Sequence, residues 1–575
     1  MQLLGFCGII DTMETVLKAS DLEQIIRSLK ATIANQAAQI AEMSALIKFY
    51  EEQFKLSQRR QFGSSSEQSP DQLRFDNMFN EPEDQADPSL KEPTYEEITY
   101  TRKKRVGKRE ADLKDLPIER IDYELTESER ACPDCGTYAD DIGVTIRDEI
   151  KIIPAQVIHV QHAVHAYACG KCKKDLDKPT PIIRADAPTP LISGSLASPS
   201  AVAYIASQKY VNGMPLYRIE KGLAYDGVTL ARQTMSNWLI HCAQTYLVAI
   251  YSLLITFLLK QDIILADETS VQVICEPGRD AKAKSYEWMY RSGSYSKNPV
   301  VIYEYQETRN HEHPEKFLKS YEGYLCCDGY QAYHNLPSDI VVAGCWSHTR
   351  RYWEKAYDTL PTNKRDGSIA ERGLVYCNLL FAFEHEYHGL SPDERYKKRL
   401  EFSKPVSDEF FDWVGTLSVL PKSLLGEAVV YALSQRKYLE NIYLDGRLEL
   451  STNLAERSIK PFVMGRKAWL FSFTPNGAES SSILYSIAET AKANGLNPYQ
   501  YFKFLLEMLP SSTSSNLEQL LPWSNTLPDI CHVPNKELNA RPPKPPIYPN
   551  KGALNQALTK LREKFTKQFG ELNST

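Results

Sequence analysis

Two aspartates and one glutamate, set far apart along the chain, constrain its fold more than any other feature. Asp267 ends a run of four apolar residues, and Asp328 ends a second short run, Tyr-Leu-Cys-Cys, and is followed at once by Gly329. Glu456 lies in a stretch with helical spacing and a polar start. Taken singly, each acid fits an ordinary turn or helix surface. Taken together, they predict one site built from two strand ends and a later helix.

Strand-like runs surround the two aspartates, namely Ile263–Asp267, Ser270–Cys275, Tyr286–Arg291, Val300–Tyr305, Tyr324–Asp328 and Ile340–Cys345. With a helix near Glu315–Lys319, they predict a mixed sheet of the ribonuclease-H type within a multidomain α/β protein. In such a core the three acids hold two Mg²⁺ ions, because hard divalent cations prefer carboxylate oxygens. We expect this catalytic domain at 259–510, with a helical insertion at about 355–440.

Length and charge set limits on the kind of protein. A chain of 575 residues holds several domains, and a net charge of −6 means that any contact with DNA must come from local basic patches. No apolar run is long enough to predict a membrane span. The first ten residues lack the features of a secretory signal, and the cysteines lack disulfide spacing. A reducing cytoplasm is therefore expected.

Residues 14–57 are predicted to form a coiled coil. Two heptad seams run through them, with Ile26, Ile33, Ile40, Ile47 and Phe54 in one and Leu22, Leu29, Gln36, Met43 and Tyr50 in the other. Isoleucine at one core position and leucine at the other favours a parallel pair of helices, so a homodimer is expected. A single amphipathic helix docked on its own protein is the alternative.

Residues 58–115 are predicted to be a linker of opposite charges. Glu81 to Ile98 holds seven acids, one lysine and three prolines, which is typical of disorder. Six of the nine residues from Thr101 to Arg109 are basic. That run fits contact with DNA phosphates and a solvated linker equally well.

Four cysteines predict a zinc-binding domain at 116–180. Cys132 and Cys135 form one CxxC pair, Cys169 and Cys172 form another, and 33 residues lie between the pairs. Two such pairs can complete the tetrahedral shell of one structural zinc ion. The segment Val157 to Tyr167 alternates like a strand and is expected to fill part of the gap.

Residues 195–258 are predicted to form a helix-turn-helix-like domain with three short helices. The first is capped at Ser198, the second runs from Pro215 to Gly227, and the third begins at Thr229. The third presents polar side chains suited to reading base edges, Arg232, Gln233 and Asn237. An ordinary helical connector would show much the same pattern.

Cations near the acids are candidates for contact with DNA phosphates, namely His348, Arg350, Arg351, Arg457, Lys460, Arg466 and Lys467. The tail at 511–575 has a proline-rich part from Pro534 to Pro549 and then an amphipathic segment. Lys551 to Phe569 carries five bases and one acid, which suits a tail that binds DNA or a partner.

From Leu22 to Trp523 the chain resembles the DDE transposases of the bacterial insertion sequence 66 group. The resemblance rests on ordered motifs, namely Gln61–Glu67, Lys209–Val211, Pro215–Arg218, Ala266–Thr269, Ser270–Val273, Cys327–Tyr330, Gly344–His348, Ala455–Arg457, Gly465–Lys467 and Thr490–Gly495. It departs from the group near the third acid, where Ser451-Thr452-Asn453 replaces Asp-Asn-Asn, Lys460 an arginine and Ala468 an asparagine.

The resemblance implies that Asp267, Asp328 and Glu456 are the metal-binding triad of an enzyme that cleaves and transfers DNA strands. Its partners would be the terminal inverted repeats of the element, target DNA and accessory proteins of the same element. Two other functions remain open: a catalytically inactive DNA-binding relic, and an enzyme that hydrolyses nucleic acid without strand transfer.

Overall fold

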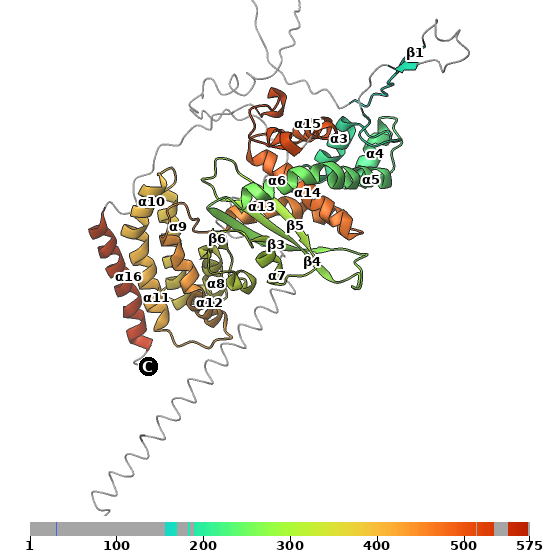
Figure 1. Cartoon of the computed structure of the whole chain (residues 1–575). Coiled ribbons are helices and arrows are strands. Elements are labelled where there is room, and N and C mark those ends of the chain that lie inside the picture. The colour runs from blue at the N-terminus through green and yellow to red at the C-terminus, as the bar shows by residue number, and fades with distance from the viewer. Residues whose placement is uncertain are drawn as a thin grey trace, which may run out of the picture.

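The computed structural model of the chain describes residues 30, 156–168, 182–184, 189–512, 514–533 and 550–572 (Figure 1). Its centre is a sheet of five strands in the order β5-β4-β3-β6-β7. The strands are β3 (Ile263–Gln272), β4 (Lys284–Ser292), β5 (Val301–Gln306), β6 (Gly323–Cys327) and β7 (Ile340–Gly344). β3, β4 and β5 pair antiparallel, whereas β6 and β7 run parallel to β3. The predicted mixed α/β sheet is confirmed.

The long strand β3 corrects one prediction. Ile263–Asp267 and Ser270–Cys275 are not separate strands, because β3 continues unbroken through Glu268 and Thr269 to Gln272. The reason is that β4 supplies hydrogen-bonding partners along this whole length, from Ile264 to Gln272. Asp267 therefore lies within a strand and not at its end.

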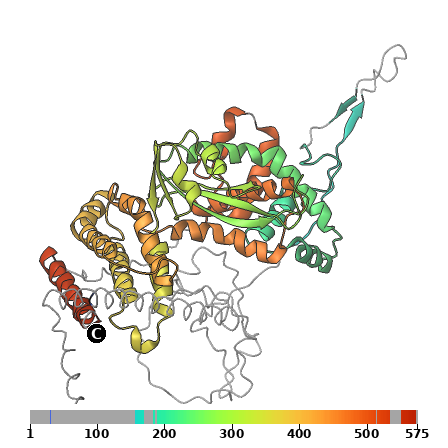
Figure 2. The same cartoon turned by 90° about the horizontal axis from the view of Figure 1, so that it is seen from below.

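Helices cover both faces of the sheet (Figures 1 and 2). α13 (Asn453–Trp469) and α14 (Pro475–Ala493) lie on one face, where the Tyr303 ring meets Phe462 and Tyr485. The short helix α7 (Glu312–Phe317) lies on the other face, where Phe317 stacks on Tyr290 at 3.9 Å. Asp267 pairs with Met289 and its neighbour Ala266 with Tyr290, so Asp267 belongs to the α13 face.

Three helices precede the sheet, α3 (Pro199–Tyr210), α4 (Leu216–Tyr225) and α5 (Arg232–Cys242). The Ser198 side chain caps α3 by accepting from the amide of Ala201 at 3.2 Å, as predicted. The third helix is not short, however. α5 continues through the π-helical turn η3 (Ala243–Leu247) into α6 (Val248–Leu258), because its apolar residues find a surface to pack against on α14 and β5.

This continuous helix, Arg232–Leu258, is long and apolar enough to cross a membrane by length and composition alone. Core helices satisfy the same criterion, so the finding is weak support for a membrane span. Leu247, Ile250, Leu254 and Leu258 are fully buried inside the protein.

A helical insertion connects β7 to α13. It contains α8 (Trp346–Asp358), α9 (Ile369–Glu386), α10 (Pro392–Lys398), α11 (Lys404–Gly415) and α12 (Leu424–Leu439), so the helical part begins nearer β7 than predicted. Aromatic side chains fill its centre, where Trp353 and Tyr376 both meet Phe410 and Trp413. Figures 1 and 2 show the insertion to one side of the sheet.

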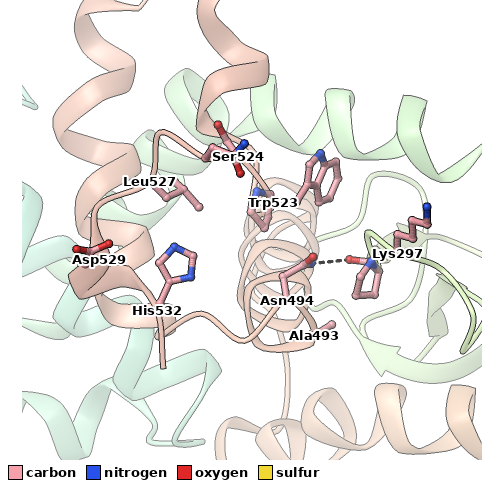
Figure 3. A pocket seen from close by; sticks show the side chains of 11 residues that line it. Lys297, Ala493, Asn494, Trp523, Ser524, Leu527, Asp529 and His532 are labelled. Carbon is pink, nitrogen blue, oxygen red and sulfur yellow. Dashed lines mark hydrogen bonds between the residues drawn. The ribbon is translucent and has the colours of Figure 1, made fainter. Parts of the chain in front are cut away.

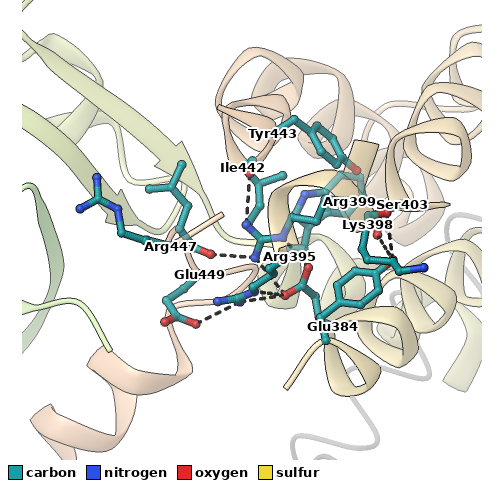
Figure 4. Close-up of polar contacts among 12 residues, drawn as sticks. Glu384, Arg395, Lys398, Arg399, Ser403, Ile442, Tyr443, Arg447 and Glu449 are labelled. Carbon is teal, nitrogen blue, oxygen red and sulfur yellow. Dashed lines mark hydrogen bonds and ion pairs between the residues drawn. The ribbon is translucent and has the colours of Figure 1, made fainter. Parts of the chain in front are cut away.

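A buried ionic network holds the insertion together beside the sheet (Figure 4). Arg399 is fully buried, and its Nε lies 2.6 Å from Glu384 on α9. The same guanidinium donates to the carbonyl oxygens of Ile442, Asp445 and Leu448, at 3.3, 3.2 and 2.7 Å. These carbonyls belong to the segment that leads into α13, so the network ties the insertion to the start of that helix.

Two helices follow the sheet domain. α15 (Pro498–Met508) packs on α3, and α16 (Lys551–Leu572) lies on the outer side of the insertion (Figure 1). Leu554 and Leu558 of α16 are buried, and Lys564 lies 3.1 Å from Asp366 and from Glu371. The amphipathic tail segment, predicted to bind DNA or a partner, thus contacts its own chain on its apolar side.

The shorter elements are β1 (Ala166–Ala168), β2 (Ile182–Arg184), η4 (Gln331–Asn335), η5 (Thr362–Lys364), η6 (Arg399–Ser403), η7 (Glu440–Tyr443), η8 (Leu509–Ser511), η9 (Ser514–Leu520) and η10 (Asp529–Cys531). β1 pairs antiparallel with β2. Of the strand predicted from Val157 to Tyr167, only its last two residues belong to β1, because β2 supplies partners to no others.

Candidate active site

Asp267 and Asp328 come together because β3 and β6 run parallel. Their last paired residues are Leu265 and Cys326, and each aspartate follows its own partner by two positions. Both side chains therefore point to the same face of the sheet. β6 ends at Cys327, so on the β6 side of β3 no strand pairs beside Asp267, and Asp328 occupies that position instead. The Asp328 carboxylate accepts from the amide of Tyr330 at 2.9 Å, which fixes the turn that holds it.

The environment of Asp267 is unusual for a carboxylate. Burial raises its pKa well above the ordinary value, and the nearby carboxylates of Glu268, Asp328 and Glu456 raise it further. The amide of Glu268, 2.9 Å from Asp267 Oδ1, opposes the rise only in part. A set of carboxylates crowded at one buried point favours the binding of a positive charge there.

Glu456 reaches the site from the first turn of α13. Ala455, Ser458 and Ile459 are buried and fix this turn against the sheet, and Arg291 of β4 donates to Ser458 Oγ at 2.5 Å. The Glu456 carboxylate does not contact the aspartates directly. Arg351 Nη2 lies 3.4 Å from its Oε1, and His348 Nε2 lies 3.9 Å away.

The donor set fits hard divalent cations, since all three predicted ligands are carboxylates. Within the part of the chain that the structure describes, no three acidic, histidine or cysteine side chains stand close enough to hold a metal ion together. Glu456 faces Arg351 and His348 in this arrangement, so a rotation of its side chain toward Asp267 would be needed to complete the set.

Glu268 is a further acid beside Asp267, with a buried side chain, that the sequence did not indicate as part of the site. Next to Asp267 along β3, it points to the opposite face, where Arg309 Nε lies 2.8 Å and Tyr333 Oη 2.6 Å from its carboxylate. Burial and Asp328 raise its pKa, while Tyr333 and Arg309 lower it. The only signal in the sequence was the pair of adjacent acids inside an apolar strand.

The insertion also contributes to the site, which the sequence did not indicate. Tyr431 of α12 lies against Gly329, where a Cβ atom added to the glycine would come within 2.7 Å of Tyr431 Oη. The Tyr431 ring stacks on Tyr352 of α8 at 4.5 Å. A phenol from the insertion therefore stands directly beside the turn that carries Asp328.

The predicted cations differ in what they contact. Burial opposes a charge on His348, but the neighbouring Cys345 sulfur and Asp328 raise its pKa to about 9. Arg350 points into the insertion, 2.6 Å from Asn378 and 3.2 Å from Glu354, so it does not face the acids. The remaining candidates lie on α13: Arg466 donates to Thr269 at 3.2 Å, and Arg457, Lys460 and Lys467 are exposed.

The predicted base-reading residues Arg232, Gln233 and Asn237 are exposed on α5, with Gln233 Nε2 3.3 Å from Asn237 Oδ1. Met235 and Trp238, on the opposite side of the helix, are buried against α3 and α4. Cys132, Cys135, Cys169 and Cys172 lie outside the described residues. So do the heptad positions of the predicted coiled coil.

A separate pocket of about 560 Å³ lies where α14 ends (Figure 3). Lys297, Asn494, Trp523, Asp529 and His532 are among the residues that line it. None of the residues that line this pocket belongs to the predicted site.

Family models match most of the described chain. The transposase IS66 family model matches residues 194–480, and the IS66 C-terminal element matches 486–523. The zinc-finger binding domain of transposase IS66 matches 129–173, a range that includes the four predicted cysteine ligands and supports zinc binding. The model described as transposase C of IS166 homeodomain matches 50–121, a range that covers the predicted linker.

Relatives from Sinorhizobium fredii agree with these matches. The chain is 30% identical to the uncharacterized protein y4jD over 431 residues, which are 72% of this chain and 81% of the relative. It is 31% identical to the uncharacterized protein y4qI over 345 residues, 57% of this chain and 62% of that relative's length. The chain belongs to the IS66 family of transposases, as its sequence motifs predicted.

Proposed function

We propose that the protein cleaves and transfers DNA strands at the ends of its insertion sequence, with a ribonuclease-H-like core as the catalytic domain. The observation that carries the proposal is that Asp267 of β3 stands next to Asp328 at the end of β6, with Glu456 near enough on α13 that the carboxylates of Asp328 and Glu456 both raise the pKa of Asp267. The strand order 5-4-3-6-7, with three antiparallel strands followed by two parallel ones, supports the same core.

In this proposal Asp267, Asp328 and Glu456 hold two Mg²⁺ ions. When bound, such ions supply Lewis acidity that activates the attacking oxygen and neutralises the leaving oxygen of a phosphodiester. The pKa of Asp267 is raised first by burial and then by the neighbouring carboxylates, and a divalent cation would offset both effects, which supports the assignment. Arg351 and His348 lie 3.4 and 3.9 Å from the Glu456 carboxylate and hold it beside the site.

The rest of the chain would position DNA on this site. Arg457, Lys460 and Lys467, exposed on α13, can neutralise phosphates next to the acids. The exposed side of α5 can read bases of the terminal inverted repeat. We also propose that the four cysteines bind one structural zinc ion and that the amino-terminal heptads pair two copies of the chain.

Amide variants test the triad most directly. Asp267→Asn, Asp328→Asn and Glu456→Gln each remove a charge while nearly preserving shape. Each should abolish Mg²⁺-dependent nicking and joining of a DNA duplex that carries the element end. Since the three acids act as one unit, a double variant should be little worse than a single one. Binding of the same DNA should persist.

Glu479→Gln is the matched control, because Glu479 is an exposed acid on α14, outside the proposed triad. Its nicking and joining rates should equal those of the wild type. If Glu456→Gln joined ends at the wild-type rate, Glu456 would not be a ligand. If the wild type bound end DNA but never nicked it, the protein would be a DNA-binding relic, and nicking without joining would identify a nuclease.

A further inference from the structure

Large apolar side chains lie exposed where the chain leaves α13. Leu470 is 65% exposed, Phe471 44% and Phe473 63%, and Met464 in the last turns of the helix is 43% exposed. We call Leu470 to Phe473 the 470–473 loop. Three large apolar residues within four positions, all facing solvent, mark a surface that contacts something else.

The backbone of this loop is strained. Leu470 has φ 68° and ψ −49°, and it is the single non-glycine residue with positive φ among those that the structure describes. The amide of Phe471 donates to the carbonyl of Trp469 at 2.9 Å across it, which makes a γ-turn of the rare, strained kind. Strain of this type persists where surrounding contacts enforce it, and it is concentrated at functional sites.

The surrounding contacts come from the end of β3. The amide of Ser472 donates to the carbonyl of Gln272 at 2.9 Å, and Ile274 and Cys275 donate to the carbonyls of Ser472 and Phe473 at 3.0 and 2.9 Å. The loop is therefore an extended segment fixed alongside the strand that carries Asp267. Phe471 and Phe473 are two positions apart in this segment, so both side chains leave it on the same side.

Charge and position indicate the kind of partner. α13 carries four bases and one acid, and two of the bases, Arg466 and Lys467, immediately precede the loop. Arg466 Nη1 lies 3.2 Å from Thr269 Oγ1 and 3.4 Å from Ser270 Oγ, so a cationic side chain lies between the loop and Asp267. Gln272 lies five positions after Asp267 on β3, which is about 16 Å at the rise of a strand. That distance is about five nucleotide steps of DNA.

From this arrangement we infer that Phe471 and Phe473 stack on unpaired bases of DNA about five nucleotides from the scissile phosphate, with Leu470 placed against the last paired step. The inference rests on the proposed function and adds to it a preference for DNA whose strands are locally separated. Aromatic side chains suit this role because every base has a face to stack on. The cations of α13 would hold the adjoining phosphates.

Binding of two labelled DNA probes by the full-length protein tests the inference. One probe is a fully paired duplex, and the other is a fork of the same sequence with one strand unpaired beyond the junction. Because stacking on an aromatic side chain strengthens binding by about five- to 160-fold per base, the wild type should bind the fork at least about fivefold more tightly. A 2-aminopurine placed about five nucleotides from the nicked position should lose fluorescence on binding.

Variants of the 470–473 loop distinguish its contribution to fork binding from that of other contacts with DNA. Replacing both phenylalanines by serine should bring the fork-to-duplex affinity ratio close to one while duplex affinity stays the same, and replacing both by tyrosine should retain the preference. Tyr396→Ser removes an exposed aromatic residue of the insertion and should change neither affinity.

Three outcomes would overturn the inference. In the first, the double serine variant keeps the preference for the fork, or the wild type binds duplex without any preference. In the second, the variant loses self-association in sedimentation and keeps its DNA preference, which would make the loop an interface between two copies. In the third, the wild type binds neither probe, and the proposed function fails as well.

Discussion

Replacing Arg399 by methionine should destabilise the junction between the insertion and α13. The fully buried guanidinium contacts both oxygens of Glu384, at 2.6 and 2.9 Å, and three backbone carbonyls. Removing one partner of a buried ion pair costs about 3–5 kcal/mol, because the remaining charge and acceptors lose their donors. Arg395, 2.8 Å from Glu384, still compensates part of that charge, so we expect about 4 kcal/mol. For a unit of this size the loss lowers Tm by about 10 °C.

Lys404→Met is the matched control in the same insertion. Lys404 pairs with Asp408 at 2.8 Å, but both side chains are 43% exposed, and such surface pairs contribute about 0–1 kcal/mol. Thermal unfolding would compare the variants, and hydrogen exchange would follow residues 440–452. If Arg399→Met melted at the same temperature as Lys404→Met, with unchanged exchange in that segment, Arg399 would not hold the junction.

The pH dependence gives a second check on the same network. Burial alone would raise the pKa of Glu384, but Arg399 and Arg395 hold it below the ordinary value. The stabilisation is therefore present above the pKa of an unfolded-chain glutamate and is lost as pH falls through the lower folded pKa. The difference in Tm between wild type and Arg399→Met should accordingly shrink below about pH 4.

Three further predictions concern separate parts of the chain. Gly329→Ala should abolish nicking, because the added Cβ would meet Tyr431 Oη at 2.7 Å and displace the turn that carries Asp328. Combining it with Tyr431→Ala should restore part of the nicking rate, and a double variant without any rescue would contradict this cause. Burial raises the pKa of Glu304 to about 7, so wild-type Tm should decline as pH rises from about 5 to about 8, and a Glu304→Gln protein with the same decline would refute the assignment. Cys132→Ser should lower the zinc content measured by elemental analysis, and undiminished zinc would remove Cys132 from the ligand set.

Local patterns in the sequence were sufficient for most strands of the sheet and for the helix that carries Glu456. Apolar runs placed β4, β5, β6 and β7 to within a few residues, and the polar start at Asn453 placed the helix of Glu456. The end of β3 could not be predicted from the sequence, because the length of this strand depends on its partner β4 and not on its own residues. The sheet order that brings Asp267 next to Asp328 followed only from the expected fold.

Contacts between distant segments account for what the sequence did not indicate. Tyr431 contacts Gly329 although 102 positions separate them in the sequence (431 − 329). No local sequence pattern indicates this contact. Glu268 was overlooked because its partners, Arg309 and Tyr333, come from the opposite face of the sheet. Arg350 was expected near the phosphate because it lies just past a strand end, but its position on α8 turns it toward α9. Helical phase, set by the start of α8 at Trp346, decides which of these cations faces the acids.

The unbroken helix from Arg232 to Leu258 sets a fixed distance between the exposed side of α5 and the start of the sheet. Its 27 residues span about 40 Å, with base-reading candidates at one end and the first strand of the sheet following the other. A rigid rod of this length would fix the spacing between a sequence recognised by α5 and the phosphate that is cut, and would also fix the side of the double helix on which each lies. Five extra base pairs between them would turn the cut site to the far side of the DNA, whereas about ten would restore its angular position, because B-DNA completes a turn in about 10 base pairs.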